Sequence, residues 1–144
     1  MELKIKQFQK AAKGFSDLVE VDLKDLKNIV DNKIIDGILN GQAQKFEYTA
    51  ELCWKLLRNY LFDYEGLTVN SPKSVIKSCY NNNLIDEQLY LELIQIINDR
   101  NKLSHIYKES DFKKITKKFK KYSLVFWKVA EIIKEKTNYK QQNG

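Results

Sequence analysis

Four polar side chains near residue 100 have the types and spacing that phosphate-ester chemistry needs. Arg100, Asn101, Ser104 and His105 lie close together in a stretch of helical periodicity. An α-helix turns by about 100° per residue, so these residues would fall at roughly 0°, 100°, 40° and 140° and form one polar wedge. If the helix continued, Tyr107 would return to the side of Arg100. A guanidinium binds phosphate oxygens as a fixed fork, and a histidine that titrates near neutrality transfers protons.

The same residues also have a purely structural interpretation. The apolar seam of residues 89–96 reaches Arg100 next, and an unpaired charge in a bundle interior costs several kcal/mol. Arg100 therefore needs an anion, a solvent-filled cleft or a carboxylate, and Glu47 or Glu51 across the bundle could supply that carboxylate. His105 could cap the C-terminal end of its helix, where a cation interacts favourably with the helix dipole. Spacing alone leaves both interpretations open.

Five helical segments must position this wedge, because apolar residues recur at steps of three and four along most of the chain. The expected segments cover residues 3–23, the stretch after Gly41 to 64, 71–80, 86–103 and 111–133. Gly37 and Gly41 are expected to mark a break or bend, and Gly66 a C-terminal cap. Two helix starts are expected: Ser71, whose hydroxyl can cap free backbone N–H groups, followed by Pro72, and Asp86, which can cap the fourth helix.

Short connections favour antiparallel neighbours, so the expected fold is all-α. We expect an up-and-down antiparallel helical bundle of four long helices plus one short helix. No repeat or linker divides the sequence, so residues 1–144 should form a single domain.

The composition agrees with a helical protein and argues against several other classes. Apolar residues make up 43% of the 144 residues, and there are only 5 glycines and 1 proline, too few for a fold rich in strands and turns. No stretch approaches the roughly 18 apolar residues that a membrane span requires. The first ten residues, MELKIKQFQK, lack the apolar region of a signal peptide. We therefore expect a cytoplasmic protein without membrane contact.

Metal and disulfide chemistry have little support in the sequence. Cys53 and Cys79 are the only cysteines, and neither belongs to a CxxC motif or a His/Cys cluster, which favours ordinary buried thiols. His105 is the single histidine, so one chain cannot supply a multi-histidine zinc site. We expect no metal and no cofactor.

Positive charge is concentrated in the last quarter of the chain. Residues 108–144 carry eleven lysines against four acids, +7, so the preceding residues come to −1 of the net +6. Lys117, Lys118 and Lys121 belong to the densest part of this segment and are candidates for contacts with RNA phosphates or an acidic partner. The alternative is a solvated helix face.

Several large apolar residues fall outside the main seams and would be exposed in a single chain. A second copy or another subunit could bury them, so we expect a homodimer. The residues are Leu56, Leu61, Phe62, Tyr90, Ile94, Ile97 and Trp127.

The segment RNKLSHIY at residues 100–107 resembles the signature of the HEPN family, an arginine and a polar residue followed after three positions by histidine. Its extension to Tyr107 resembles the HepT-like form. The segment FEYTAELCWK at residues 46–55 is similar to a helix of nucleotidyltransferase substrate-binding proteins, and Ser71-Pro72-Lys73 matches as well. The resemblance covers roughly residues 3–135.

This resemblance implies a toxin that is a metal-independent endoribonuclease. It implies a homodimer whose two Arg/His motifs meet at one cleft, with Arg100 holding phosphate, Asn101 orienting the scissile group and His105 transferring protons. Glu47, Glu51 and Ser104 would support the site. Here Glu47 and Glu51 share a helical face with Lys55, which favours ion-pair scaffolding over catalysis.

The resemblance also implies a partner, a cognate minimal nucleotidyltransferase that acts as antitoxin and transfers AMP to Tyr107. This chain cannot perform that transfer, because it lacks the Gly-Ser followed by paired aspartates of such enzymes. Two alternatives remain at this point. The chain could be a non-catalytic subunit that binds substrate or nucleotide for a two-component nucleotidyltransferase, or a purely structural dimeric bundle.

Overall fold

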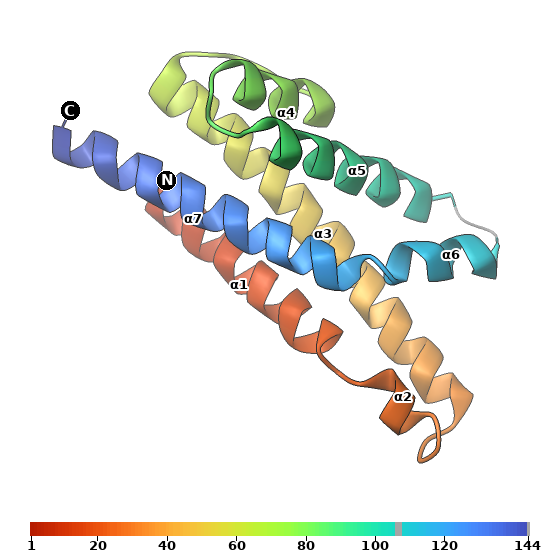
Figure 1. Cartoon of the computed structure of the whole chain (residues 1–144). Coiled ribbons are helices and arrows are strands. Elements are labelled where there is room, and N and C mark those ends of the chain that lie inside the picture. Colours follow the sequence, from red (N-terminus) through yellow and green to blue (C-terminus); the bar gives the residue numbers. More distant parts are fainter. Residues whose placement is uncertain (106–107, 144) are drawn as a thin grey trace.

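The described residues, 1–105 and 108–143 of a computed structural model, form seven α-helices and no strand (Figure 1). The long helices α1, α3, α5 and α7 run alternately in opposite directions, which confirms the expected all-α bundle. The helices are α1 (Glu2–Val19), α2 (Leu23–Leu26), α3 (Asn32–Glu65), α4 (Pro72–Asn81), α5 (Glu87–Leu103), α6 (Glu109–Thr116) and α7 (Phe119–Asn143). Three short helices, α2, α4 and α6, therefore stand where one was expected.

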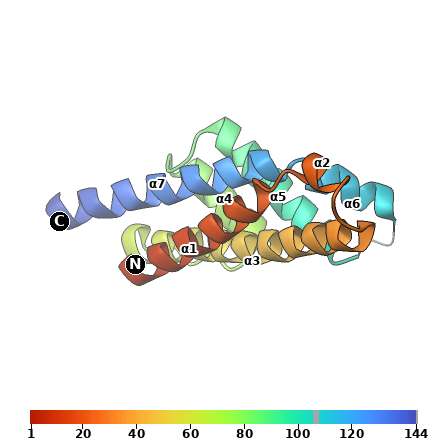
Figure 2. The ribbon, with the colours of Figure 1, turned by 90° about the horizontal axis from the view of Figure 1, so that it is seen from below.

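Both chain ends lie at one end of the bundle, and α2 and α6 lie at the other (Figures 1 and 2). The C-terminal end of α5, which carries the polar wedge, points toward the end with α2 and α6. Among the described residues, none of the helices has the length and apolarity needed to cross a lipid bilayer.

Helix boundaries follow local chemistry. Asp86 caps α5 by accepting a hydrogen bond from the backbone N–H of Leu89 at 2.8 Å, as expected. Gly66 ends α3 in the left-handed conformation, with φ of 67°, which also matches the expectation. Ser71 precedes Pro72 in extended backbone at the start of α4, but its hydroxyl makes no capping hydrogen bond, so that part of the prediction was wrong. Extended backbone before a proline is sufficient to start this helix.

The break expected at Gly37 and Gly41 is absent, because α3 runs unbroken for 34 residues through both glycines. At Gly41 a Cβ atom would stand 3.4 Å from Cδ2 of Leu18, at van der Waals distance, so this glycine lies where α1 and α3 pack together. Gln42 donates a hydrogen bond to the carbonyl of Leu18 at 3.2 Å, in the same region of contact. Gly41 therefore lies within a helix–helix contact and does not end a helix.

The expected fifth helix is divided into α6 and α7. At the division the N–H of Lys118 donates to the carbonyl of Ile115, three residues back, so the regular pattern of bonds to the fourth preceding residue is interrupted. Ile115 and Phe119 on either side are both buried, so the apolar period continues through the turn. A pattern that stays in phase gives no sign of such an interruption.

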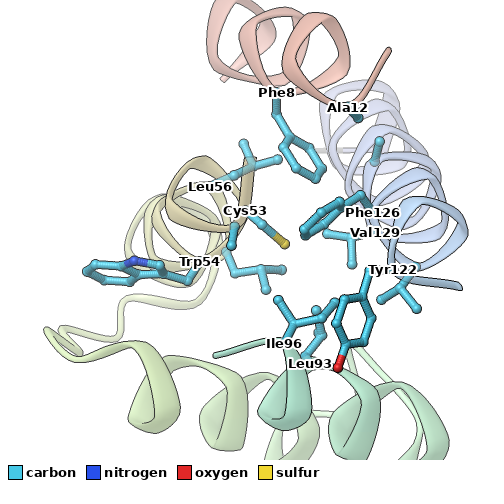
Figure 3. Close-up of a cluster of buried hydrophobic side chains, with 14 of the residues drawn as sticks. Phe8, Ala12, Cys53, Trp54, Leu56, Leu93, Ile96, Tyr122, Phe126 and Val129 are labelled. Atoms are coloured by element: carbon cyan, nitrogen blue, oxygen red, sulfur yellow. The ribbon is translucent and has the colours of Figure 1, made fainter. Parts of the chain in front are cut away.

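Aromatic rings from three long helices fill the centre of the bundle. The Phe46 ring of α3 stacks on Phe119 of α7 with centroids 4.9 Å apart, and Phe15 of α1 meets Phe119 edge to face. Figure 3 shows Phe8 and Phe126 pointing into the same interior. Burial of these rings fixes where α1, α3 and α7 lie relative to one another.

Some of the apolar residues that were expected at the surface are buried inside the bundle. Leu56, Leu61 and Ile97 are buried within one chain, so they provide no surface for a partner. They point into the bundle because the contact faces of α3 and α5 are wider than one seam. Phe62 is 62% exposed, while the other members of the expected set, Tyr90, Ile94 and Trp127, are partly buried. Cys53 and Cys79 are buried free thiols, as expected.

Candidate functional site

The site begins where α5 ends. Asn101 lies in the last turn of α5, Leu103 is its last residue, and Ser104 forms the C-terminal cap with helical backbone angles. His105 follows in a turn, with its N–H donating to the carbonyl of Lys102 at 2.9 Å. The angular positions of the wedge therefore apply up to Ser104 and not to a continued helix. The expected location of Tyr107 beside Arg100 lies outside the described residues.

Arg100 pairs with a carboxylate on α3. Its Nη2 donates to Oε2 of Glu51 at 2.5 Å, and its Nη1 donates to Oδ1 of Asn101 at 3.4 Å. The same Glu51 oxygen accepts from the indole N–H of Trp54 at 3.0 Å, and Oε1 faces Nζ of Lys55 at 3.2 Å. Of the two carboxylates considered from the sequence, Glu51 is therefore the partner of Arg100.

Glu47, one turn before Glu51, is half-buried and has no ion-pair partner among the residues that the structure describes. Its role in the site stays a prediction. Asn101, Ser104 and His105 have exposed side chains.

The charge of Glu51 is stabilised by its neighbours. Burial alone would raise the pKa of this carboxyl, but hydrogen bonds from Trp54 and Lys55 and the positive charges of Arg100 and Lys55 together hold it below its ordinary value. The Arg100 and Glu51 side chains are 31% and 28% exposed, so solvent screens the pair and its net contribution to stability is on the order of 1 kcal/mol or less. Its main effect is to fix the guanidinium in one place.

Asp99 is a buried carboxylate that the sequence analysis missed. Its side chain accepts hydrogen bonds from the Tyr122 hydroxyl at 2.5 Å and from Nζ of Lys118 at 3.1 Å. Only 2% of the residue is exposed. Burial, and then the hydrogen bond to the Asp99 carboxylate, raise the pKa of Tyr122 well above its ordinary value. Figure 3 shows the Tyr122 hydroxyl directed toward α5.

A sequence signal for Asp99 was present. A step of four from Ile96 leads to Arg100, but a step of three leads equally well to Asp99. Lys118 and Tyr122 are four residues apart, which places both on one helical face and lets them approach a single carboxylate. A seam that meets two charged residues in succession requires a partner for each, so Asp99 needed a partner as much as Arg100 did.

His105 lies on the wall of a cavity of about 470 Å³ between the end of α5 and α6. Four lysines face this cavity against two aspartates, so it attracts anions. Its lining residues are Asp99, Lys102, His105, Lys108, Asp111, Lys114, Ile115 and Lys118. Arg100, Asn101 and Ser104 do not line the cavity. Within one chain, His105 and Lys118 thus line the same cavity, whereas Arg100 pairs with Glu51 on α3.

The three candidate lysines have different environments. Lys118 lies at the His105 cavity and pairs with Asp99. Lys117 is exposed at the end of α6 and lines another cavity, on the other side of that helix. Lys121 is exposed on α7 and lines neither cavity. Within the described part of the chain, no cluster of three or more histidine, cysteine or acidic residues could hold a metal ion.

Two solved structures share this fold. A protein from Thermus thermophilus is 25% identical, with a TM-score of 0.74 over 88% of this chain and 98% of that chain. A tri-AMPylated Shewanella oneidensis HEPN toxin, solved in complex with an MNT antitoxin, has a TM-score of 0.68 and 20% identity over 92% of this chain and 94% of that chain. At that identity the likeness concerns the fold. A search of curated proteins gives no significant match.

The sequence itself matches a family over nearly its whole length. Residues 3–135, which include α2 to α6, the Arg100–His105 segment and most of α1 and α7, match the family described as nucleotidyltransferase substrate binding protein like. The match spans the range over which the resemblance was expected and includes both the α3 segment and the end of α5. The chain therefore belongs to the nucleotidyltransferase substrate binding protein like family, of the HepT-like group, and it has the fold of a HEPN toxin.

Proposed function

We propose that this protein is a HEPN-type toxin that cleaves RNA without a metal ion and is neutralised by a minimal nucleotidyltransferase. The observation that carries the proposal is the position of His105, exposed at the end of α5 on a cavity that four lysines face. Lysines at such a cavity bind phosphates, and an exposed imidazole can exchange protons with a bound substrate. The fold likeness to a HEPN toxin supports the same assignment.

Cleavage of RNA requires a base, stabilisation of the charged phosphorane and an acid, and these side chains can supply all three. A base removes the proton of the 2′-hydroxyl, whose oxygen then attacks the adjacent phosphorus. Charge on the phosphorane is stabilised by Arg100 and by the cavity lysines, and an acid protonates the departing 5′ oxygen. The products are a cyclic 2′,3′-phosphate and a free 5′-hydroxyl. His105 acts as base or acid, and Asn101 orients the phosphate through its amide.

A homodimer completes the site. One chain has a single histidine, whereas the reaction uses a base and an acid, and two copies related by a two-fold axis bring two histidines and two arginines. Exposed apolar side chains on three helices support a contact between copies, and they are Phe62, Leu91 and Leu124. Light scattering that finds only monomers at micromolar concentration would contradict this part of the proposal.

The partner is a cognate minimal nucleotidyltransferase, as the family description and the complex of the Shewanella oneidensis toxin with its MNT antitoxin suggest. It transfers AMP from ATP to Tyr107, so the phenol oxygen bonds to the α-phosphorus while pyrophosphate and the phenol proton leave. The added phosphate brings negative charge and bulk two residues after His105 in the sequence, which excludes RNA. Intact mass after co-expression tests this step. An AMP adduct is expected on the wild type and none on Tyr107→Phe.

The nuclease assignment is tested with purified protein and total RNA in the presence of EDTA. Wild-type protein should produce fragments with 5′-hydroxyl ends, while Arg100→Ala and His105→Ala should lose at least two orders of magnitude in rate. Arg100 stabilises the charge that develops on the phosphorane and His105 transfers protons, and each effect contributes about 10²-fold or more. Lys45→Ala, a lysine of another cavity, is the matched control and should cleave normally. Equal cleavage by all four proteins would attribute the activity to a contaminant and refute the proposal.

A second candidate function follows from the ion pair of Arg100. Glu51 already occupies Nη2 of this guanidinium, which is compatible with a non-catalytic subunit that holds a nucleotide at the cationic cavity for a nucleotidyltransferase. Such a subunit would bind ATP or AMP but leave total RNA intact. Calorimetric titration of the wild type and Lys114→Glu with ATP, beside the RNA assay, separates the two functions.

A further inference from the structure

We propose that a groove on the far side of α6 binds the single-stranded part of the RNA that leaves the His105 cavity. This inference rests on the proposed ribonuclease function and adds a second, non-catalytic contact site to it. The groove has a volume of about 610 Å³ and lies between α2, the first turns of α3, and α6. It is larger than the His105 cavity of about 470 Å³.

The rim of the groove is cationic. Lys24 and Lys27, in and just after α2, line it together with Lys113 and Lys117, in and just after α6, against Asp36 and Glu109 only. Glu109 pairs with Lys113 at 3.3 Å, but the two side chains are 77% and 59% exposed. A surface pair of this kind is weak, so Lys113 can exchange its carboxylate for a phosphate. The groove therefore matches a ligand with several negative charges.

The two cavities share a helix. Lys114 and Lys118 line the His105 cavity, and Lys113 and Lys117 line the groove, so α6 and the turn after it present lysines to both sides. An α-helix with its side chains is about 10–12 Å across. At roughly 3.4 Å per nucleotide of a stacked strand, about three or four nucleotides cross it. An RNA strand bound at His105 can therefore reach the groove with only a few further nucleotides.

The apolar residues that line the groove indicate whether it binds single-stranded or double-stranded RNA. Leu23, Ile35 and Leu39 provide an apolar surface between the lysines. A single strand can place the faces of unpaired bases against such a floor while its phosphates meet the rim, whereas a duplex hides its base faces and presents mainly phosphates and sugars. The combination of apolar floor and basic rim thus favours single-stranded RNA. The lysines that α6 and the turn after it present to both the His105 cavity and the groove favour RNA over a docked protein segment.

The test compares two double charge reversals in a His105→Ala background, so that the RNA is not cleaved during binding. Lys24→Glu with Lys27→Glu changes the groove, and Lys10→Glu with Lys45→Glu makes the same charge change at a cavity between α1 and α3 that shares no lining residue with it. The probe is fluorescein-labelled oligouridylate, alone or annealed to oligoadenylate. Fluorescence anisotropy is measured over a salt series.

The groove variant should bind the single strand more weakly, and the slope of log K against log salt should fall in magnitude by roughly 1.4 if two phosphate contacts are lost. The control variant should bind the single strand with the same affinity and salt slope as its parent. Both the control variant and its parent should bind the annealed probe more weakly than the single strand. Equal affinities and slopes for the groove variant and the control would overturn the inference. The groove variant could instead bind RNA as its parent does and fail to bind the partner nucleotidyltransferase. That result would overturn the inference and identify the groove as a protein-docking site.

Cleavage assays with His105 intact separate this inference from the proposed function. With a long RNA the groove variant should show a raised KM and an unchanged kcat, because the groove acts on binding alone. With a dinucleotide, which cannot span α6, it should equal the wild type. A wild type that cleaves neither substrate refutes the ribonuclease itself. A wild type that cleaves both, with no KM effect in the groove variant, refutes only the groove.

Discussion

At the scale of single residues, Asp99 and Arg100 are neighbours near the end of α5, bear opposite charges and pair with different parts of the bundle. Asp99 reaches Lys118 in the turn before α7 and Tyr122 in the first turn of α7, and Arg100 reaches Glu51 on α3. Each bond resists rotation of α5 about its axis, and together they fix the turn that presents His105. The location of the histidine thus depends on residues that touch no substrate.

The Tyr122 hydroxyl should matter for stability, because it is one of two donors to a buried carboxylate. Tyr122→Phe leaves the ring in place and removes one hydrogen bond to Asp99, so the free energy of unfolding should fall by about 1–3 kcal/mol. Urea unfolding followed by circular dichroism measures this loss. Tyr48→Phe is the control, because Tyr48 is 61% exposed. Equal losses in both variants would mean that the bond to Asp99 contributes nothing specific.

The ion pair of Glu51 should make stability depend on pH in the acidic range. The pKa of Glu51 lies below its ordinary value of 4.5 in the folded protein, so its contribution is complete above that value and disappears as pH falls through the lower folded value. Wild type should therefore exceed Glu51→Gln in free energy of unfolding at neutral pH, and the difference should close in acid. Urea melts across this range measure it. A constant gap between wild type and Glu51→Gln across this range would contradict the assignment.

At the scale of elements, α3 carries both the central core face and the carboxylate that holds Arg100. Its continuity through Gly37 leads to a prediction of increased stability. A Cβ atom at Gly37 would meet nothing within 4 Å, and the residue lies inside the helix. Gly37→Ala should therefore raise the free energy of unfolding by roughly 0.5–1 kcal/mol, because glycine is a poor helix former.

Thermal and urea unfolding measure this gain, and Gly66→Ala is the matched control. Gly66 has a φ of 67°, which strains any other side chain, so the same substitution should destabilise the protein there. A loss of stability at both glycines would indicate that α3 bends or breaks near Gly37 in solution.

Much of this architecture was accessible from the sequence, for physical reasons that also explain the failures. Apolar periodicity revealed the long helices and the seam on α5, because burial of one helical face is what stabilises them. It could not reveal the division between α6 and α7, since the period stays in phase across Lys118. It also could not choose between Asp99 and Arg100 as the buried charge. The choice depends on partners from other helices, which only the folded chain brings together.

At the scale of the whole molecule, the separation of Arg100 from the His105 cavity leads to a complementation experiment. In the proposed site the histidines of both copies act as base and acid at one cleft. A mixed dimer of Arg100→Ala and His105→Ala chains has only one arginine and one histidine there, so it lacks one of the two proton-transfer groups. Mixing the two variants should therefore leave the cleavage rate at least two orders of magnitude below that of the wild type.

The experiment unfolds and refolds an equimolar mixture of the two variants, so that subunits exchange, and measures RNA cleavage in EDTA. Each variant refolded alone is the control for activity that refolding itself produces. Cleavage that stays low while light scattering shows mixed dimers would support one cleft that uses both histidines and both arginines. Restored cleavage, at about half the wild-type rate, would mean that Arg100 of each copy serves His105 of the other at two separate sites. The single cleft with a histidine from each copy as base and acid would then be wrong.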